Sequence, residues 1–392
     1  MMEWEVYRQK IRTFSAEIES GRLKMFRSSM DDGFAVRVIV DKKVGFSSGK
    51  NVQKAMEEAK KIAKISEDYL EDFPCEKPTK VDGIYDRSFE NLSADYIKEE
   101  FEILKSSVEK ANIANAFISH EIAEISLENS FGAELHRMET YSLLSLETVY
   151  EKGSAYAQCE SRKLKLDVAS VATYAEELAV KSSKAKEIEE GYYDIVLMPY
   201  AVHQLFSHTL YPSLSAENVA KGRSRVEIGF QLGNIRLIDD PTISGGLASY
   251  PFDDEGAKAR KKILVDRKVL NFYSDWKNSK NFGVAGNGLR LSLDLPPMPM
   301  PSNVVIEADE KVEMDSALIV HSIIGAHTAN AVSGDFSVEV LNAEFDGKPI
   351  RSAMIYGNIF EVLSRVQGFC SKTEQFENTI TSALRFHRLR VV

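Results

Sequence analysis

The sequence predicts a fold of mixed helices and strands in two parts. Helical and strand patterns are interspersed in the first half of the 392 residues, strand patterns dominate after about Lys221, and a charged stretch at residues 187–191 separates the halves. A chain of this length is expected to form two or possibly three domains with their own hydrophobic cores. We therefore expect one domain over residues 1–190 and a β-rich domain over residues 191–392.

The first half opens with a predicted amphipathic helix at residues 2–20, because large apolar residues recur there at helical spacing and Gly21 supplies a stop. Those apolar residues are Trp4, Tyr7, Ile11, Phe14 and Ile18. Alternating segments then predict a three-stranded meander with a turn at residues 31–33. The strands are expected at residues 23–29, 34–40 and 44–48, and a helix at residues 52–65.

The rest of the first half is predicted to be a helix, four strands and another helix. Ser93 is a suitable N-cap for a helix that runs to about residue 112. Apolar and polar residues alternate in the strands, and residues 129–132 have the composition of a turn. The strands are expected at residues 116–124, 125–129, 134–150 and 154–161, and the last helix at residues 168–183.

The second half begins with a buried strand at residues 195–198, which Pro199 ends, and a helix that starts near Ala201. Residues 257–266 and 269–273 predict a hairpin, and long loops are expected at residues 241–254 and 274–289. A short helix is expected at residues 359–365. The remaining strands are expected at residues 226–231, 235–239, 304–307, 317–324, 331–332, 336–345, 350–356 and 379–391.

The helix near Ala201 carries His203-Gln204-Leu205-Phe206-Ser207-His208, which differs from a metallopeptidase motif by one residue type. Helical histidines that share a metal are usually four apart, whereas these are five apart and roughly 140° around an ideal helix. They could share a metal only across a kink or a π-bulge. Gln204 also stands where a glutamate would act as general base. Ordinary helix residues, a residual metal site and an active hydrolytic site all remain open.

Composition restricts the classes of partner. The formal net charge is −10 and the isoelectric point is about 5.4, which argues against a broad nucleic-acid-binding face. Three scattered cysteines form no CxxC pair, which fits a reducing cytosol. The N-terminus is too charged for a signal peptide, and no apolar run approaches the ~20 residues of a membrane span. We expect a cytoplasmic protein without a nucleic-acid or membrane partner.

Other side-chain groups have weaker spacing. His321 and His327, with Asp335, could line a cleft, although packed or hydrogen-bonded roles are the simpler interpretation. The glycines around Gly246 and Gly286 resemble phosphate-binding loops only in composition, and tight turns beside a cleft are the favoured interpretation.

Short motifs occur in order along nearly the whole chain. They lie at residues 32–38 (DGFAVRV), 44–48 (VGFSS), 83–86 (GIYD), 129–132 (NSFG), 249–256 (SYPFDDEG), 333–337 (SGDFS) and 355–358 (IYGN). In this order and spacing they resemble the TldD/PmbA family, also called modulators of DNA gyrase, and its PmbA (TldE) branch most closely. The resemblance implies an α+β protein with an N-terminal α/β domain of antiparallel strands and helices, and a β-rich C-terminal domain.

The resemblance also implies a dimer that acts as a metallopeptidase on peptides. A TldD-type subunit holds zinc with HExxxH and a distal cysteine, and pairs with a TldE-type subunit, while some members pair with themselves. Here Gln204 replaces the glutamate, and Cys370 follows Asn358 too closely to match the family's cysteine. We therefore expect no cofactor in this chain and zinc in a TldD-type partner. His203, His208 and Cys370 are the weak candidates for metal ligands.

The sequence thus predicts a TldE/PmbA-type subunit that pairs through its β-rich half and completes the substrate cleft of an HExxxH partner. Two alternatives are a self-associating, peptidase-like, peptide-binding protein and a non-enzymatic regulator of gyrase or another protein. Whether this chain itself catalyses proteolysis stays open. The candidate cleft residues are Gly246, Phe252, Gly286, Asn287, His327 and Asp335.

Overall fold

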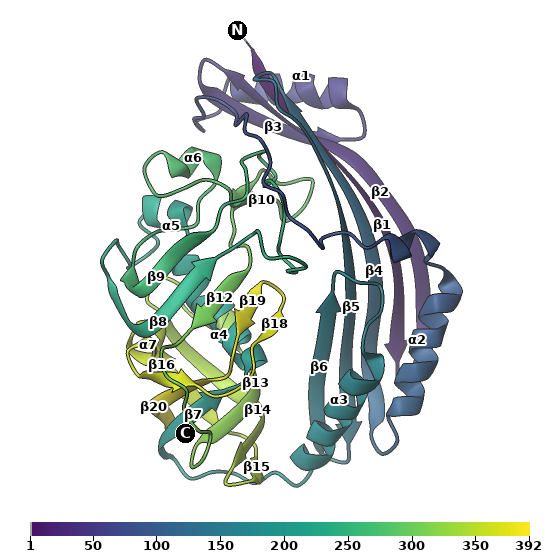
Figure 1. Ribbon diagram of the computed structural model, residues 1–392, viewed down its shortest axis with the longest axis vertical. Helices are drawn as coiled ribbons and strands as arrows, with labels where there is room; N and C mark the ends of the chain where they lie inside the picture. Colours follow the sequence, from purple (N-terminus) through teal and green to yellow (C-terminus); the bar gives the residue numbers. More distant parts are fainter. Residues whose placement is uncertain (1) are drawn as a thin grey trace.

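The framework of the molecule consists of a long curved sheet from the first half of the chain and two sheets of shorter strands from the second half (Figure 1). The computed structural model describes residues 2–392. The first sheet has six antiparallel strands, and the second half supplies a seven-stranded and a five-stranded sheet. Helices and strands are both well represented, so the predicted α+β class is confirmed.

The first sheet has the strand order β3-β2-β1-β4-β5-β6, so that two three-stranded meanders join where β1 pairs with β4. The predicted strands at residues 44–48, 134–150 and 154–161 are confirmed. The strands are β1 (Glu3–Glu19), β2 (Arg22–Val40), β3 (Lys43–Gly49), β4 (Asn112–Asn129), β5 (Glu134–Tyr150) and β6 (Gly153–Ser161).

Three helices pack on one face of this sheet, and the second half of the chain lies on the other side (Figure 1). They are α1 (Val52–Ala63), α2 (Ala94–Ser107) and α3 (Val168–Ser182), with a short 3₁₀ turn, η1 (Arg87–Asn91), before α2. Small residues let the helices approach closely, as where Ala55 and Ala59 of α1 meet Val36 of β2. The predicted helices at residues 52–65 and 168–183 are confirmed, whereas α2 ends earlier than predicted.

The predicted helix at residues 2–20 is wrong, because this segment is the central strand β1. Even-numbered Val6 and Phe14 face the helices, whereas odd-numbered Tyr7 faces a loop of the second half. A strand that is covered on both faces carries large apolar residues on both, so the two-residue alternation is lost. The apolar residues of β1 then recur at a spacing close to that of a helix.

Two predicted breaks do not interrupt the strands. The expected turn at residues 31–33 lies inside β2, where Asp32 pairs with Lys10 of β1. The expected strands at residues 116–124 and 125–129 are both part of β4, which pairs with β1 and β5 on either side. Ladder hydrogen bonds to long neighbouring strands therefore override the local turn preference of Asp and Gly.

The second half encloses helix α4 (Pro199–Ser213) in a core shared by both of its sheets. One sheet contains β7 (Gly191–Leu197), β13 (Leu318–Ile324), β14 (Asp335–Phe345), β15 (Lys348–Ile350), β16 (Met354–Asn358), β17 (Val366–Phe369) and β20 (Leu384–Val391). The other contains β8 (Gln231–Asp239), β9 (Lys262–Val269), β12 (Val304–Glu307), β18 (Glu374–Phe376) and β19 (Thr379–Thr381). Shorter elements are α5 (Ala216–Ala220), α6 (Trp276–Ser279), β10 (Gly288–Leu289), β11 (Met298–Pro299), η2 (Ala326–Thr328) and α7 (Ile359–Leu363).

Most predicted elements of the second half are confirmed, including β12, β13, β14 and α7. The predicted hairpin around residues 267–268 is wrong, because β9 continues through Arg267, which adopts a positive φ of 59°. Residues 226–230 and 331–332 lie outside the strands. Short apolar runs carry too little periodicity to separate strands from packed turns.

The loop at residues 249–256, which contains the candidate cleft residue Phe252, docks on the first sheet. Phe252 is fully buried against Tyr7. Beside it, Arg37 of β2 donates to Glu255 at 2.6 Å, and Arg137 of β5 donates to Asp254 at 2.8 Å. These buried ion pairs join the two halves of the chain.

Asp275, the residue that caps α6, gives this junction a predicted pH dependence. Burial, reinforced by the nearby Glu255 carboxylate, raises the pKa of Asp275 to about 7. Between pH 4 and 7 the folded chain therefore keeps a proton that the unfolded chain has lost, and stability falls as the pH rises. Asp275→Asn, which keeps the acceptor for the Asn278 N–H, should remove this loss of up to about 1.4 kcal/mol per pH unit.

The measurement is urea unfolding of both proteins at pH 5 and at pH 7.5. The free energy of unfolding of the wild type should fall relative to that of Asp275→Asn as the pH rises. Parallel changes in the two proteins would contradict a buried, protonated Asp275.

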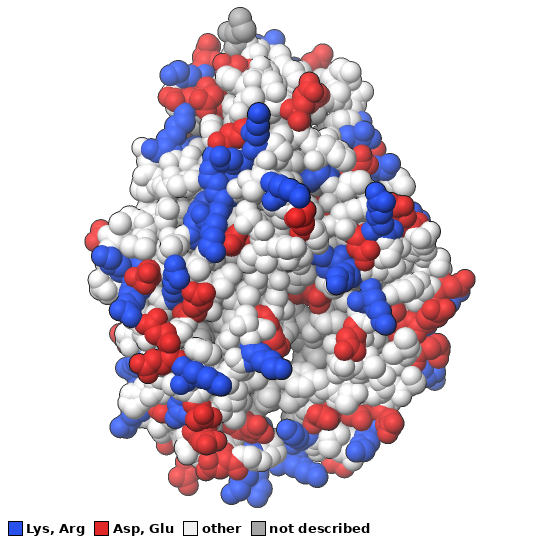
Figure 2. Space-filling model, in the orientation of Figure 1, with Lys and Arg blue, Asp and Glu red and all other residues white. Residues whose placement is uncertain are grey.

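The surface carries charges of both signs. Acidic and basic side chains are interspersed over the face seen in Figure 2, and much of that face is uncharged. None of the helices in residues 2–392 combines the length and the apolar content that a membrane span requires. The predicted absence of a nucleic-acid partner stays a prediction.

Candidate functional site

The motif that the sequence singles out lies at the start of α4. Pro199 occupies the first turn, where its missing N–H costs nothing. The helix is regular through residues 203–208, so His203 and His208 point roughly 140° apart. The kink or bulge that would let them share a metal is not present in this described segment.

His203 is held by the hairpin that β18 and β19 form. Its side chain is 7% exposed, and its Nδ1 lies 2.9 Å from the Thr379 hydroxyl, which also lies 2.7 Å from the Tyr211 hydroxyl. On the other side of the ring, Nε2 lies 3.5 Å from the Glu377 carboxylate. A hydrogen bond from His203 lowers the pKa of Glu377 despite its partial burial. Both ring nitrogens therefore have protein partners.

Gln204 has a backbone partner in β13. Its side-chain oxygen accepts a hydrogen bond from the Ile323 N–H at 2.8 Å. Ile323 is itself buried, so this bond satisfies a main-chain donor that would otherwise lose its contact with water. The amide ties α4 to β13, and this structural role accounts for its position beside His203.

The remaining metal candidates do not complete a ligand set. His208 is exposed, and burial first, then the nearby His203 and His327, lowers its pKa. Burial raises the pKa of the Cys370 thiol to about 11, which disfavours the thiolate that binds zinc. Within residues 2–392 no group of three or more His, Cys, Asp or Glu side chains is placed to hold a metal. The residues present do not fit a zinc ion.

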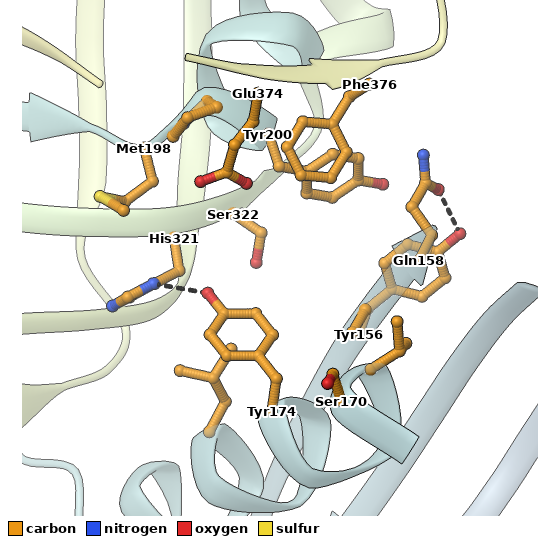
Figure 3. Close-up of a pocket in the computed structure, with 14 residues that line it drawn as sticks. Tyr156, Gln158, Ser170, Tyr174, Met198, Tyr200, His321, Ser322, Glu374 and Phe376 are labelled. Atoms are coloured by element: carbon orange, nitrogen blue, oxygen red, sulfur yellow. Dashed lines mark hydrogen bonds between the residues drawn. The ribbon is translucent and has the colours of Figure 1, made fainter. Parts of the chain in front are cut away.

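A cavity of about 400 Å³ opens beside the first turn of α4 (Figure 3). It lies between β6 and α3 of the first half and α4, β13 and β18 of the second half. Figure 3 shows the Glu374 carboxylate directed into the space near Met198 and Tyr200. The lining residues are Tyr156, Ala157, Gln158, Ser170, Val171, Tyr174, Leu178, Met198, Pro199, Tyr200, His321, Ser322, Glu374 and Phe376.

His321 lies in this cavity wall. Its Nδ1 is 2.9 Å from the Tyr174 hydroxyl, so the contact joins β13 to α3. Burial lowers the pKa of His321; the nearby Glu344 carboxylate opposes this shift, and Lys181 adds to it. The imidazole is therefore neutral at pH 7 and adds no positive charge to the cavity.

The candidate cleft residues lie in other places. Gly246 and Asn287 are buried, and Asn287 donates to Asp239 at 2.9 Å and to the Met300 carbonyl. A side chain at Gly286 would meet the Lys258 carbonyl at 2.8 Å, so the glycine permits a close approach of two backbones. These three residues hold loops together and are absent from the lining of the cavity.

The other two cleft candidates are exposed. His327 lies in η2, near enough to His208 to influence its pKa, and Asp335 accepts hydrogen bonds from Ser333 and Asn358 at the start of β14. Neither lines the cavity, whereas His321 does. The cavity residues come from separate elements and carry no common motif, so the sequence pointed only to His321 as a possible cleft residue.

Two family models match the sequence. One is described as the PmbA/TldA metallopeptidase C-terminal domain and covers residues 190–392, and the other as the PmbA/TldA metallopeptidase domain 1, over residues 4–63. An uncharacterized protein of Methanocaldococcus jannaschii is 31% identical over 381 residues, which span 92% of this chain and 89% of that protein. A metalloprotease of the same organism is 24% identical over 324 residues, 76% of this chain and 71% of its own length.

Solved structures are similar over the whole chain. TldE from Thermococcus kodakarensis superposes with a TM-score of 0.90 at 22% identity and covers 100% of this chain and 96% of its own. A Thermotoga maritima protein described as a candidate modulator of a DNA gyrase gives a TM-score of 0.88 at 22% identity, with the same coverage. At these identities the likeness shows the fold alone.

Proposed function

This chain belongs to the PmbA/TldD metallopeptidase family, and on that premise we propose that it is a TldE-type subunit of a peptide-processing complex. In this proposal the chain carries no zinc, and it completes the substrate cleft of a TldD-type partner that does. The metallopeptidase chemistry of the complex then takes place on the partner's HExxxH helix.

The hydrogen bond between Gln204 and the Ile323 N–H is the observation that carries this proposal. A general base must reach the water that it deprotonates, whereas this side chain is an amide and is bound to main chain. His203 is likewise engaged by Thr379 and Glu377. The motif helix thus has a structural role, which supports a subunit without its own reaction centre.

An unpaired strand edge supports assembly with another chain. β3 pairs with β2 only over residues 34–40, so residues 22–33 form the outer edge of the described sheet. Apolar side chains are exposed along this edge: Leu23, Met25, Phe26 and Met30. An open apolar edge is a ready template for strand pairing. We place the partner contact here, in the first half, in preference to the β-rich half that the sequence suggested.

The same edge also fits a second candidate function, self-association. Two copies could pair edge to edge about a twofold axis, because antiparallel strand pairing is self-complementary. A self-pairing, peptide-binding protein would then form without a TldD-type partner. Sedimentation of the chain alone and in a mixture with an HExxxH partner separates the two assemblies.

Metal content tests the proposal directly. The chain purified without a histidine tag should contain far less than one zinc per chain, because a catalytic zinc needs at least three protein ligands. Gln204→Glu should produce no chelator-sensitive cleavage of unfolded peptides, because it restores the carboxylate but not the ligand set. Elemental analysis and a peptidase assay check both results. One tightly held zinc that is lost in His203→Ala would refute the proposal.

A further inference from the structure

We propose that the cavity beside α4 binds a cationic side chain, a lysine ammonium or an arginine guanidinium, of a peptide. The juxtaposition that supports this assignment is one carboxylate, on Glu374, surrounded by aromatic rings from both halves of the chain. The proposal deepens the proposed function, because it rests on peptides as the ligands and adds the class of side chain that this subunit selects.

Aromatic rings form two sides of the cavity. Tyr200, in the first turn of α4, stacks on Tyr156 of β6 with a centroid distance of 5.8 Å and lies 5.2 Å from the Phe376 ring. Tyr174 of α3 stands across from them beside His321 (Figure 3). Ring faces attract cations, and rings from several elements can enclose a methylene chain together with its charged end.

Strand alternation directs Glu374 into this space. In β18, Glu374 and Phe376 share a face and both line the cavity, whereas Gln375 points the other way and donates to Asn303 at 2.9 Å. Pairing with β19 fixes the register, since Glu374 lies opposite Thr381. Glu374 is exposed on one side, but its strand register is set by the fold and its carboxylate lies in the cavity wall.

The carboxylate lacks a cation of its own. The residues that line the cavity include neither lysine nor arginine, and none of the ion pairs within residues 2–392 involves Glu374. Partial burial raises the pKa of Glu374, with no opposing positive group. A negative group that is partly desolvated and unpaired is stabilised by an incoming cation. The neutral His321 does not compete for it.

The cavity also offers apolar contacts and enough volume for such a side chain. Leu178 and Met198 supply apolar contact for methylene groups, and the open volume of about 400 Å³ exceeds that of one side chain. Glu377, three residues from Glu374, is engaged with His203. The ligand charge is thus directed to Glu374 alone.

Calorimetric titration of the whole chain with acetyl-Gly-Gly-Lys-Gly-Gly-amide and its norleucine counterpart tests the proposal. The lysine peptide should bind about tenfold more tightly, because norleucine keeps the methylenes and lacks the charge. Glu374→Gln should remove this preference and leave norleucine binding unchanged. The arginine and citrulline peptides should give the same pattern. Butylammonium chloride tests whether a free amine binds as well as the peptide does.

Glu227→Gln is the matched control, because Glu227 is an exposed carboxylate outside the cavity, and it should keep the preference. Equal binding of the lysine and norleucine peptides, or a preference that survives Glu374→Gln, would overturn the proposal. Butylammonium binding as tight as that of the lysine peptide would reject a peptide ligand. The titration uses the chain without partner or zinc, so its failure is distinct from a failure to assist a peptidase.

Discussion

Mixing this chain with a TldD-type HExxxH partner should raise the cleavage of unfolded peptides more than about tenfold above that of the partner alone, equivalent to about 1.4 kcal/mol of transition-state stabilisation. The reason is that a zinc site in an incomplete cleft holds an extended substrate poorly, whereas a completed cleft orients the peptide against the metal. Initial rates with a quenched fluorescent peptide measure this gain, and sedimentation measures assembly.

The edge of β2 provides matched variants for that experiment. Met30→Glu places a charge on an exposed apolar residue of the proposed interface, at 61% exposure, and should abolish the gain without unfolding the chain. Ile65→Glu makes the same change at a residue that is 82% exposed and lies outside that edge, and should keep the gain. A partner that is fully active alone, and that this chain neither binds nor accelerates, would refute the subunit function.

Removing Arg37 should produce a large loss of stability. Its guanidinium makes two hydrogen bonds of 2.8 Å to Glu5 and one of 2.6 Å to Glu255. Arg37→Leu would leave both buried carboxylates without this partner, which typically costs about 3–5 kcal/mol. Urea unfolding should therefore show a much lower midpoint, and the junction between the two halves of the chain should weaken first.

Arg8→Leu is the matched control on the neighbouring strand. Arg8 also pairs with a carboxylate at 2.8 Å, on Asp32, but its side chain is 47% exposed, and such surface pairs contribute about 1 kcal/mol or less. If Arg37→Leu were as mild as Arg8→Leu, the buried network would not hold the halves together. Arg290, whose guanidinium lies 3.6 Å from Glu5, would then be the group that neutralises the Glu5 carboxylate in place of Arg37.

The sequence predicted the elements with a complete local signal. Helix α1 has small residues along one side and an Asn51 cap, and buried and less buried residues alternate in β5 from Thr140 to Val149. Prediction from the sequence failed for β1, because that strand is covered on both faces. It also failed for β2, because pairing with β1 keeps residues 31–33 in one continuous strand. In both cases the deciding contacts come from residues far away in the sequence.

The candidate site was likewise predictable from the sequence only in part. The sequence by itself determined the family, the α+β class and the replacement of a catalytic glutamate by Gln204, because these depend on residue identity and order. Only the tertiary structure decided that Gln204 accepts a hydrogen bond from β13, that Phe252 is buried against the first sheet, and that Glu374 lines one cavity with Tyr156 and Tyr200. Such contacts join segments that are well over a hundred residues apart, and local periodicity carries no information about which distant segments pack together.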